Sequence, residues 1–401
     1  MKNIHLRQLH TVTQNLKNMK TITLTIVFHL ILIMSIKAQS FERYKTLTDT
    51  TIISKNLGFE KSIKVTVPVE WQSDINKNFP LIIIFDKQNQ RSHNYILQTI
   101  DYLTSNEQMP SCVIVSVESV QEYRYLETLY NASDANGLAE ENEKFIFEEL
   151  IPLAEKQYKA SDYRLFVGHS RYGFFTTSLL TSRTEELNAI ISLSPFFQQK
   201  NVCLTDSLNL LSAKNLQHPV YYRFGIGNDY PEDFYKMDSV LQSHPIPMLN
   251  AKGYLFKEAE HNVTPGLTIA MALYQIFEKW SEIQSEYLIN EHFDLTKINE
   301  LEKEIERCYG NSLAFSLGIL NGKGWDFYSN EQYDEAVEAW EILLKNYPNF
   351  SEGYLYIIDA QMKLGKDTSD TKKLFLTSVA KSKFYSEDEI MELMEDYKSF
   401  N

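Results

Sequence analysis

Cysteine is scarce in this sequence. Only Cys112, Cys203 and Cys308 occur in 401 residues, and they match neither a zinc-ligand spacing nor a CxxC motif. No pair of histidines sits at metal-ligand spacing either. The sequence therefore predicts no metal site and no cofactor. Cys112 and Cys203 lie in or beside apolar runs and are expected to be small core residues.

Basic residues are outnumbered. Lys and Arg total 39 against 53 Asp and Glu, which gives a formal net charge of −14. An acidic chain without a Lys/Arg cluster argues against nucleic acid as a partner. Hydrophobic residues make up 43% and aromatic residues 13%, so the chain is globular rather than disordered. Its length suffices for one large or two ordinary domains with a real core.

The apolar segment near the N-terminus is too short to be an ordinary membrane span. MKTITLTIVFHLILIMSIKAQS begins at Met19 and has a charged start, an apolar part over 21–36 and a small residue, Ala38. These parts are typical of a secretory signal, whereas a membrane helix needs about 20 apolar residues. We expect residues 1–38 to be a signal region, with the start at Met19, cleavage after Ala38 and a periplasmic or secreted protein. An uncleaved membrane anchor is the alternative, because Ile36 stands where a smaller residue is usual.

The stretch from about residue 41 to 285 alternates between strand and helix patterns. FPLIIIF at 79–85 indicates a strand buried on both faces, whereas SIKVTVPV at 62–69 indicates a half-exposed strand. Further strands are expected at 111–117, 163–168, 188–195, 220–227 and 253–260, and helices at 143–158, 174–182 and 265–280. This alternation predicts a mostly parallel sheet covered on both faces, with ligands at the carboxyl ends of its strands.

One expected strand ends in GHSRYG, residues 168–173. A strand, a sharp Gly-x-Ser turn and a helix place the hydroxyl of Ser170 above the sheet edge, where the N–H groups of the helix start point. Gly168 fills the position two before the serine, but Tyr172 stands two after it, where Gly is usual. Ser170 is therefore a candidate nucleophile. The alternative is a serine that only caps the helix.

A serine nucleophile needs a base and usually an acid that orients the base. Of the four histidines after Ser170, only His261 directly follows the last expected strand and precedes the closing helix. We expect it to be the base rather than an exposed loop histidine. Asp229 is the first carboxylate after the preceding strand, and Glu232 and Asp233 are close behind. Each is a candidate acid; a solvated acidic loop and a Ser–His pair without an acid remain open.

Several segments follow one another as in a known family. They include FPLIIIFDKQNQ, EYRYLETLY, FIFEELIPLAEKQY, RLFVGHSRYG and EHNVTPGLTIAMALYQIF. Over roughly residues 45 to 283 the chain resembles the putative esterase family of α/β hydrolases, which includes enterochelin (siderophore) esterases and esterase D relatives. The resemblance implies an α/β-hydrolase fold and an ester hydrolase with Ser170 as nucleophile, His261 as base and Asp229 as the orienting acid. Relatives commonly carry x-Gly-Gly after the serine, whereas Arg171-Tyr172-Gly173 stands here.

The oxyanion of such a reaction needs two N–H donors. We expect one from the backbone of Arg171 and the other from Lys87 or Gln88, in the loop after LIIIF. Arg171 would also place a cation at the mouth of the site, suited to an acidic or phenolate-bearing substrate, unless it pairs with a nearby acid. Tyr172 could line the substrate pocket. Arg124 resembles a recurrent arginine of the family and is expected to give structural support.

The tail is acidic and helical by pattern. GKGWDFYSNEQYDEAVEAWEILLKNYPNF fits one tetratricopeptide repeat, with Gly324, Ala336 and Trp340 at or near marked spacings, and a weaker copy follows. Two such repeats cannot bury a full core alone. We therefore expect an all-α domain at 286–401 that packs on the hydrolase domain, 45–285, or on a second subunit. It could bind a partner, extend the substrate cleft or act only as a stabilising cap.

Two classes of function follow from these patterns. The first is a secreted serine esterase that cleaves siderophore, feruloyl, acetyl-sugar or other carboxylic esters through an acyl-enzyme. The second is a catalytically weak hydrolase fold that serves as a protein-interaction module through its helical tail. The Ser–His pair in the correct chain order favours the first class. Tyr172 and the open choice of acid favour the second.

Overall fold

The chain is described here by a computed structural model that covers residues 41–72, 78–211, 216–243, 245–289, 295–311, 313–382 and 385–400. The predicted signal region, 1–38 with its start at Met19, lies outside the described residues. Arg43–Asn401 form one compact unit. Every helix within the described ranges is too short or too polar to cross a membrane.

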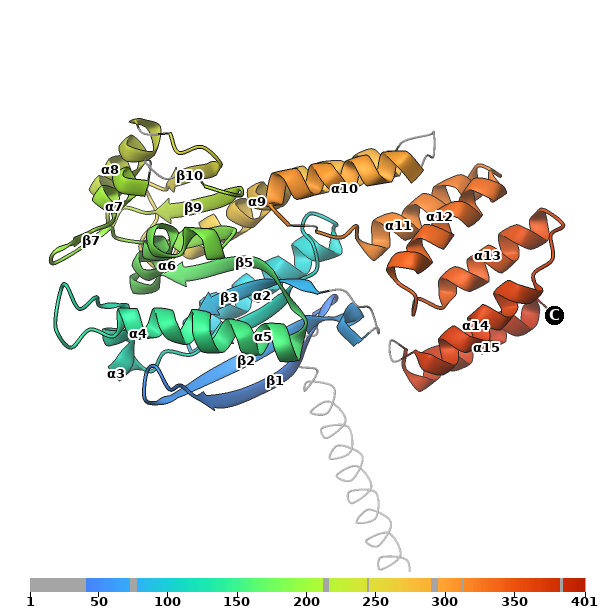
Figure 1. Ribbon diagram of the computed structural model, residues 1–401, viewed down its shortest axis with the longest axis horizontal. Helices are drawn as coiled ribbons and strands as arrows, with labels where there is room; N and C mark the ends of the chain where they lie inside the picture. The colour runs from blue at the N-terminus through green and yellow to red at the C-terminus, as the bar shows by residue number, and fades with distance from the viewer. Residues whose placement is uncertain are drawn as a thin grey trace, which may run out of the picture. The chain divides into compact units, whose positions relative to one another are not determined.

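One sheet organises the N-terminal part of this unit. Within the described residues it has eight strands in the order β1-β2-β4-β3-β5-β6-β9-β10 (Figure 1). Only the pairs β1–β2 and β2–β4 are antiparallel; the other neighbours run parallel. The strands of the sheet are β1 (Tyr44–Ile53), β2 (Glu60–Pro68), β3 (Phe79–Phe85), β4 (Val113–Val117), β5 (Ala160–His169), β6 (Ala189–Leu193), β9 (Val220–Ile226) and β10 (Leu249–Leu255). The predicted mostly parallel sheet is confirmed.

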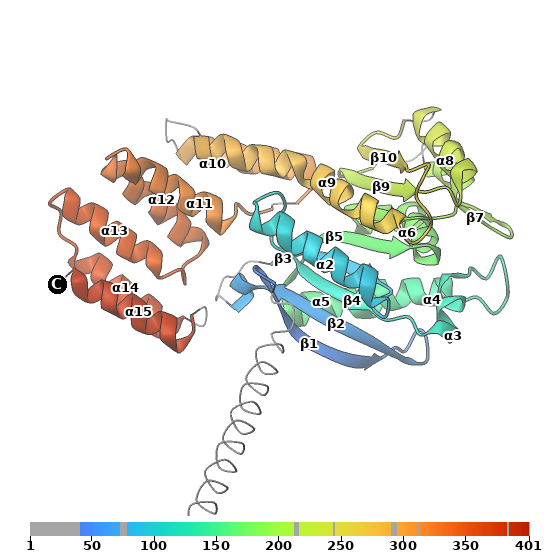
Figure 2. The ribbon, with the colours of Figure 1, turned by 180° about the vertical axis from the view of Figure 1, so that it is seen from behind.

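Helices cover both faces of the sheet. Helices α2 and α9 lie on one face, and α5 and α6 lie on the other, as the opposite views in Figures 1 and 2 show. The helices of this part are α2 (Gln90–Ser105), α3 (Gln121–Arg124), α4 (Ala139–Lys144), α5 (Ile151–Tyr158), α6 (Arg171–Ser182), α7 (Leu204–Leu211), α8 (Pro231–Ser243) and α9 (Thr264–Ile289). Short 3-10 turns are η1 (Val69–Gln72), η2 (Leu126–Thr128) and η4 (Thr184–Glu186), a π-helical turn is η3 (Phe145–Leu150), and a small ribbon pairs β7 (Gln198–Gln199) with β8 (Val202–Cys203).

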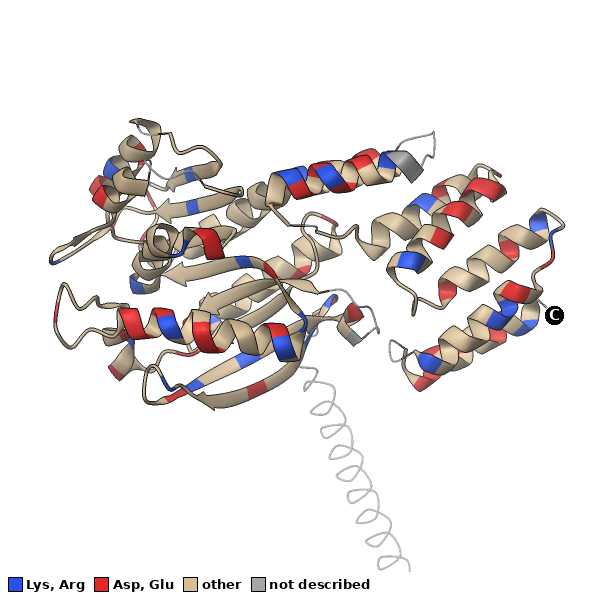
Figure 3. Ribbon diagram, in the orientation of Figure 1, with Lys and Arg blue, Asp and Glu red and all other residues tan. Residues whose placement is uncertain are grey.

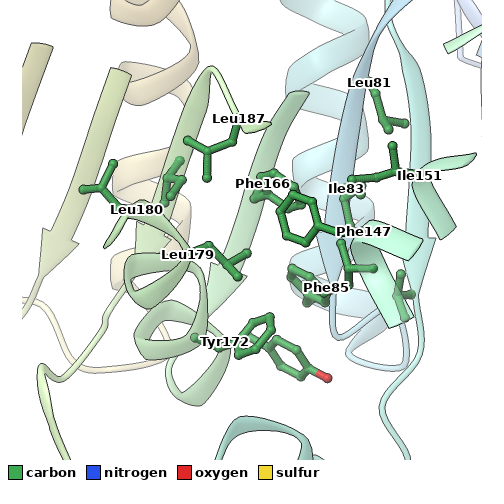
Figure 4. Close-up of a cluster of buried hydrophobic side chains, with 14 of the residues drawn as sticks. Leu81, Ile83, Phe85, Phe147, Ile151, Phe166, Tyr172, Leu179, Leu180 and Leu187 are labelled. Carbon is green, nitrogen blue, oxygen red and sulfur yellow. The ribbon is translucent and has the colours of Figure 1, made fainter. Parts of the chain in front are cut away.

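The central strands are apolar because they are covered on both sides. β3, β4 and β6 contain no charged residue and are buried throughout, whereas charged residues are frequent on the outer helices (Figure 3). Alternate strand residues share a face, so Leu81, Ile83 and Phe85 enter one core with Phe147 and Phe166 (Figure 4). This core fixes the end of β5, where the candidate serine stands.

The tail consists of helices α10 (Leu295–Tyr309), α11 (Leu317–Ser329), α12 (Tyr333–Asn346), α13 (Glu352–Lys363), α14 (Ser369–Lys381) and α15 (Glu387–Ser399). From α11 to α14, each helix packs against the next. A Cβ at Gly324 would lie 2.2 Å from Nε1 of Trp340, so the glycine permits the close approach of α11 and α12. The assignment of these helices as tetratricopeptide repeats stays a prediction.

The end of α10 packs into the sheet part of the unit. Tyr309 is fully buried, and its hydroxyl accepts from the N–H of Trp280 at 2.9 Å and donates to Ile276 O at 3.0 Å. The hydroxyl of Tyr221, at the start of β9, donates to Cys308 O at 3.0 Å. Helix α9 itself runs across the domain boundary predicted at 285/286. Residues after that boundary therefore complete the core around α9.

Candidate active site

Ser170 occupies a strained turn between β5 and α6. Its backbone angles are φ 59° and ψ −113°, a region that residues with a side chain rarely adopt. Its N–H donates to Leu193 O of the neighbouring strand at 2.8 Å. A Cβ at Gly168 would lie 2.2 Å from the carbonyl oxygen of Tyr172, so only glycine lets the helix start this close to the strand. The geometry is that of a nucleophile elbow, in which the serine side chain is presented at the sheet edge.

His261 and Asp229 meet at the same edge of the sheet. Asp229 follows β9 and His261 follows β10, and His261 Nδ1 lies 2.5 Å from Asp229 Oδ2. The hydroxyl of Ser194, just after β6, donates to the same carboxylate oxygen at 2.9 Å. Burial alone would raise the pKa of Asp229, but the hydrogen bonds from His261 and Ser194 outweigh it and lower the pKa. The carboxylate therefore stays ionised and holds one ring nitrogen of His261.

One cavity contains the serine and the histidine. It has a volume of about 510 Å³, and both Ser170 and His261 line it. Asp229 lies behind His261, with 15% of its side chain exposed. Glu232 and Asp233 stand in the first turn of α8, and neither belongs to the described residues that line the cavity. Of the three candidate acids, only Asp229 is placed to orient the histidine.

The two candidates for the second oxyanion donor differ. The N–H of Lys87 already donates to Val117 O at 3.0 Å, and its ammonium group pairs with Asp49 at 2.6 Å. This bond to the neighbouring strand β4 removes Lys87 from the candidates. Gln88 lines the cavity, and its side chain holds the loop by bonds to Asp86 and to the N–H of Ser119. Among the described residues, the N–H of Gln88 has no backbone acceptor.

Tyr172 does not line the cavity, so the prediction that it binds substrate is wrong. Its side chain is fully buried and stacks on Phe85 with ring centroids 4.4 Å apart. Its hydroxyl donates to the buried carboxylate of Glu127 and accepts from Ser119 at 2.6 Å. Figure 4 shows Tyr172 among the buried side chains of this core. Tyr172 is the second residue of α6, and its side chain points back toward the sheet. At this position relatives commonly carry a glycine; here the tyrosine ring fills the space beside the sheet.

Two arginines line the cavity in different ways. Arg124 forms two 2.7 Å bonds to the carboxylate of Asp86 and a third, at 3.1 Å, to His169 O, which fits the structural role expected for it. Arg171 lies over the ring of Tyr125, with its guanidinium carbon 3.9 Å from the centroid. Within the described residues, Arg171 forms no ion pair with an acid. Its charge is therefore free to act on a ligand in the cavity.

Sequence reasoning missed two residues of the site. The ring of His169 lies 4.8 Å from that of His261, and burial and this neighbouring ring lower the pKa of His169 to about 4. It is therefore neutral near pH 7. Ser194 bonds to Asp229 from the end of β6. Both residues stand at carboxyl ends of expected strands, where ligand sites of such sheets lie, and this position could have identified them from the sequence. Within the described residues, no group of three His, Cys, Asp or Glu is arranged to hold a metal ion.

Comparisons with known proteins agree with this fold. Residues 54–232 match the family model for putative esterases. The chain is similar in structure to an uncharacterised protein from Capnocytophaga ochracea DSM 7271, with 16% identity, a TM-score of 0.56, and coverage of 88% of this chain and 99% of that one. It is also similar to an IroE-like serine hydrolase from Shewanella oneidensis, with 15% identity, a TM-score of 0.59, and coverage of 76% and 100%. At such identities the similarity shows a shared fold. Among curated proteins, none matches the sequence significantly.

Proposed function

Because the chain belongs to the putative esterase family and is a carboxylic ester hydrolase, we propose that it acts through an acyl-enzyme on Ser170. In this proposal His261 is the general base and Asp229 orients it. The observation that carries the proposal is the 2.5 Å contact between His261 Nδ1 and Asp229 Oδ2, in a cavity shared with a serine in a strained turn. The name of the structural relative from Shewanella oneidensis, a serine hydrolase, is in keeping with it.

Each half of the reaction needs two proton transfers through one histidine. Asp229 binds Nδ1 of His261, so Nε2 is left to accept the proton of the Ser170 hydroxyl. The serine oxygen then bonds to the ester carbonyl carbon, and the tetrahedral intermediate expels the alcohol, which takes the proton from Nε2. Water repeats the sequence on the acyl-enzyme and releases the carboxylic acid and the free serine.

The negative oxygen of the intermediate would be held by backbone donors. Arg171 is the first residue of α6, and the first N–H groups of a helix lack partners within the helix. The N–H of Gln88, in the loop after β3, is the second donor of the proposal. Two such donors stabilise the oxyanion more than the ground-state carbonyl, which lowers the barrier.

The cavity favours an ester that carries an acid or a phenolate. The guanidinium of Arg171 lies in the cavity wall without a carboxylate partner among the described residues, while the charge of Arg124 is matched by Asp86. Siderophore, feruloyl and acetyl-sugar esters remain the substrate classes to compare, and the first two offer catechol or phenol oxygens to which a guanidinium can donate charge-assisted hydrogen bonds. The proposal also includes secretion, which rests on the signal pattern in 19–38 of the sequence.

A fluorophosphonate probe tests the serine mechanism directly, because it labels only an activated serine. We expect the purified protein to be labelled, Ser170→Ala to be unlabelled and His261→Ala to be labelled much more slowly. Ser182→Ala is the matched control, since Ser182 lies at the other end of α6 and bonds to Glu143. It is expected to be labelled like the wild type.

Ester hydrolysis should then vary among these variants in the same way as the labelling. The substrates to test are a short-chain nitrophenyl ester, methyl ferulate, an acetylated sugar and a catecholate siderophore ester. A folded wild type that takes up no label would overturn the serine mechanism. That outcome would favour the second class of function, a hydrolase fold without catalysis whose helical tail binds a partner.

A further inference from the structure

A second cavity lies among the C-terminal helices. Its volume of about 530 Å³ falls within the range of small-molecule sites. Its walls come from α11, α12, α13 and α15, together with Tyr385 and Phe400. The esterase mechanism uses none of these residues, so the cavity calls for an explanation of its own.

One wall of this cavity is aromatic. Trp325 lies with its ring centroid 4.8 Å from Tyr356 and 5.3 Å from Trp340, and the rings of Trp340 and Tyr356 are also 5.3 Å apart. Trp340 is fully buried, but Trp325 is 39% exposed. A tryptophan ring is the most favourable of the aromatic faces for a cation. The wall therefore offers an accessible surface that attracts alkyl chains and positive charge alike.

The rest of the lining is acidic. Five carboxylates border the cavity, and among the described residues that line it there is no Lys or Arg. They are Glu352 and Asp359 of α13 and Glu389, Glu392 and Asp396 of α15. The three on α15 are spaced three and four residues apart, so they share one helix face, where like charges destabilise the helix. The three carboxylates repel one another on this face, and a bound cation would relieve that repulsion.

Protein partners satisfy only part of this charge. Asp359 accepts from the hydroxyl of Tyr328, Glu352 accepts from Tyr385 at 2.5 Å, and Glu389 belongs to the N-terminal capping box of α15. Burial raises the pKa of Glu352, because its charged form is poorly solvated there. Within the described residues, Glu392 and Asp396 have neither a hydrogen bond nor an ion pair through their side chains. The exposed carboxylates at the mouth are therefore left for a ligand.

We propose that this cavity binds a free aliphatic polyamine. The ammonium groups would pair with Glu392 and Asp396, and the chain between them would lie along the exposed ring of Trp325. Such a ligand matches both parts of the lining, since its methylene groups suit the aromatic wall and its charges suit the carboxylates. A bare metal ion would leave the aromatic wall unused. The site is separate from Ser170, and the proposal stands without the esterase mechanism.

Spermidine is the probe, titrated into the full-length protein and followed by calorimetry and by tryptophan fluorescence. We expect saturable binding that weakens at high salt, and no binding of a neutral diol of similar length. The double variant Glu392→Gln/Asp396→Asn changes two exposed side chains and should bind at least about tenfold more weakly. Trp325→Ala should bind about tenfold more weakly as well. The matched control is Glu338→Gln/Glu341→Gln, which removes two exposed charges of α12 that lie outside the lining and should bind like the wild type.

Three results would overturn the proposal. The first is the absence of spermidine binding to the folded wild type. The second is spermidine binding of equal affinity in all three variants and the wild type, which would indicate a general attraction to an acidic protein. The third is binding of a pentalysine peptide but not of spermidine, because the cavity would then serve a protein partner. Hydrolysis by Ser170 is measured in parallel and should not change in any variant.

Discussion

Ser194 Oγ donates to Oδ2 of Asp229, the same carboxylate oxygen that contacts His261 Nδ1. Ser194 lies just after β6 and has a positive φ of 48°. Three strand ends therefore meet at one oxygen atom: β6 through Ser194, β9 through Asp229 and β10 through His261. The acid is fixed from two sides, which prevents its carboxylate from turning away from the imidazole.

Asp229→Asn should lower kcat strongly and leave the fold intact. The amide cannot stabilise a positive imidazole, and its NH2 group would favour the wrong tautomer of His261. A loss on the order of 10²–10⁴-fold in kcat is expected from such a change. Steady-state hydrolysis of a nitrophenyl ester measures it, with circular dichroism to verify folding.

The alternative acids provide the controls for this change. Glu232→Gln and Asp233→Asn alter carboxylates of α8 that do not line the cavity, and both variants should keep nearly wild-type kcat. If Asp229→Asn kept activity as well, the site would work as a Ser–His pair and our assignment of the acid would fail.

Arg171→Ala should change substrate preference rather than the chemical step. The substitution keeps the backbone N–H that we propose as an oxyanion donor but removes the guanidinium that lies over Tyr125. We expect KM to rise about tenfold for an ester with a carboxylate or phenolate and less than about threefold for a neutral ester. Equal changes in KM for both esters would contradict a direct contact with the substrate. Arg171→Lys is expected to restore only part of the preference, because an ammonium does not stack as a guanidinium does.

Lys61→Met should destabilise the protein markedly. Lys61 and Glu127 are 1% and 0% exposed, and their charged groups lie 2.7 Å apart. Removal of the ammonium leaves the buried carboxylate of Glu127 without its ion-pair partner, at a cost of about 3–5 kcal/mol in the free energy of unfolding. Urea denaturation measures the change. The double variant Lys61→Met/Glu127→Gln should recover part of the loss, while Lys373→Met, which breaks an exposed pair with Asp370, should have little effect.

The stability of the protein should fall as the pH is lowered from about 6.5 to 4, in part because of His93. Burial lowers the pKa of His93 to about 4, below its usual value of about 6.5. Between pH 6.5 and 4 the unfolded chain binds a proton at His93 that the folded protein does not, so acid favours unfolding. Above pH 6.5 neither state binds this proton, and the stabilisation from the neutral His93 is fully present. Between pH 7 and 4.5 His93 should account for about 2–3 kcal/mol.

His93→Gln provides the comparison for this pH dependence. Glutamine can keep a hydrogen bond to Ser116, which the His93 ring contacts at 2.7 Å, but cannot be protonated. The free energy of unfolding of the variant, measured by urea denaturation at several pH values, should decline less steeply below pH 6.5 than that of the wild type. Two parallel curves would show that His93 is not the group responsible.

Patterns in the sequence predicted the strands and helices whose residues are largely buried in the core. The run at 79–85 is β3 with the same limits, because a strand buried on both faces is apolar throughout. Strand β1 and helix α2 went unpredicted: β1 is a half-exposed edge strand with many threonines, and α2 has a polar first turn. Chain order and strand ends were enough to single out Ser170, Asp229 and His261 for one edge of the sheet.

Side-chain direction and backbone pairing could not be predicted in this way. The spacing places Tyr172 two residues after Ser170, but only the packing of α6 on the sheet shows that its ring turns inward to Glu127. Likewise the loop after β3 offers two N–H groups by sequence, and the bond from Lys87 to Val117, on the neighbouring strand, removes one of them. Both facts depend on neighbours that lie far away in the sequence.

Tyr309 bears on how such proteins can change during evolution. Its hydroxyl bonds to the backbone of α9 at Trp280 and Ile276, and its ring fills a place beside Tyr163 and Tyr221. A gene cut after residue 285 would leave that place hollow, so recombination cannot detach the whole tail as a cassette. Residues just after α10 also pack on α9, since Nε1 of Trp280 donates to Ala314 O and α11 lies against α9. Insertions and losses are instead expected to be tolerated from α13 onward, where the helices pack on one another.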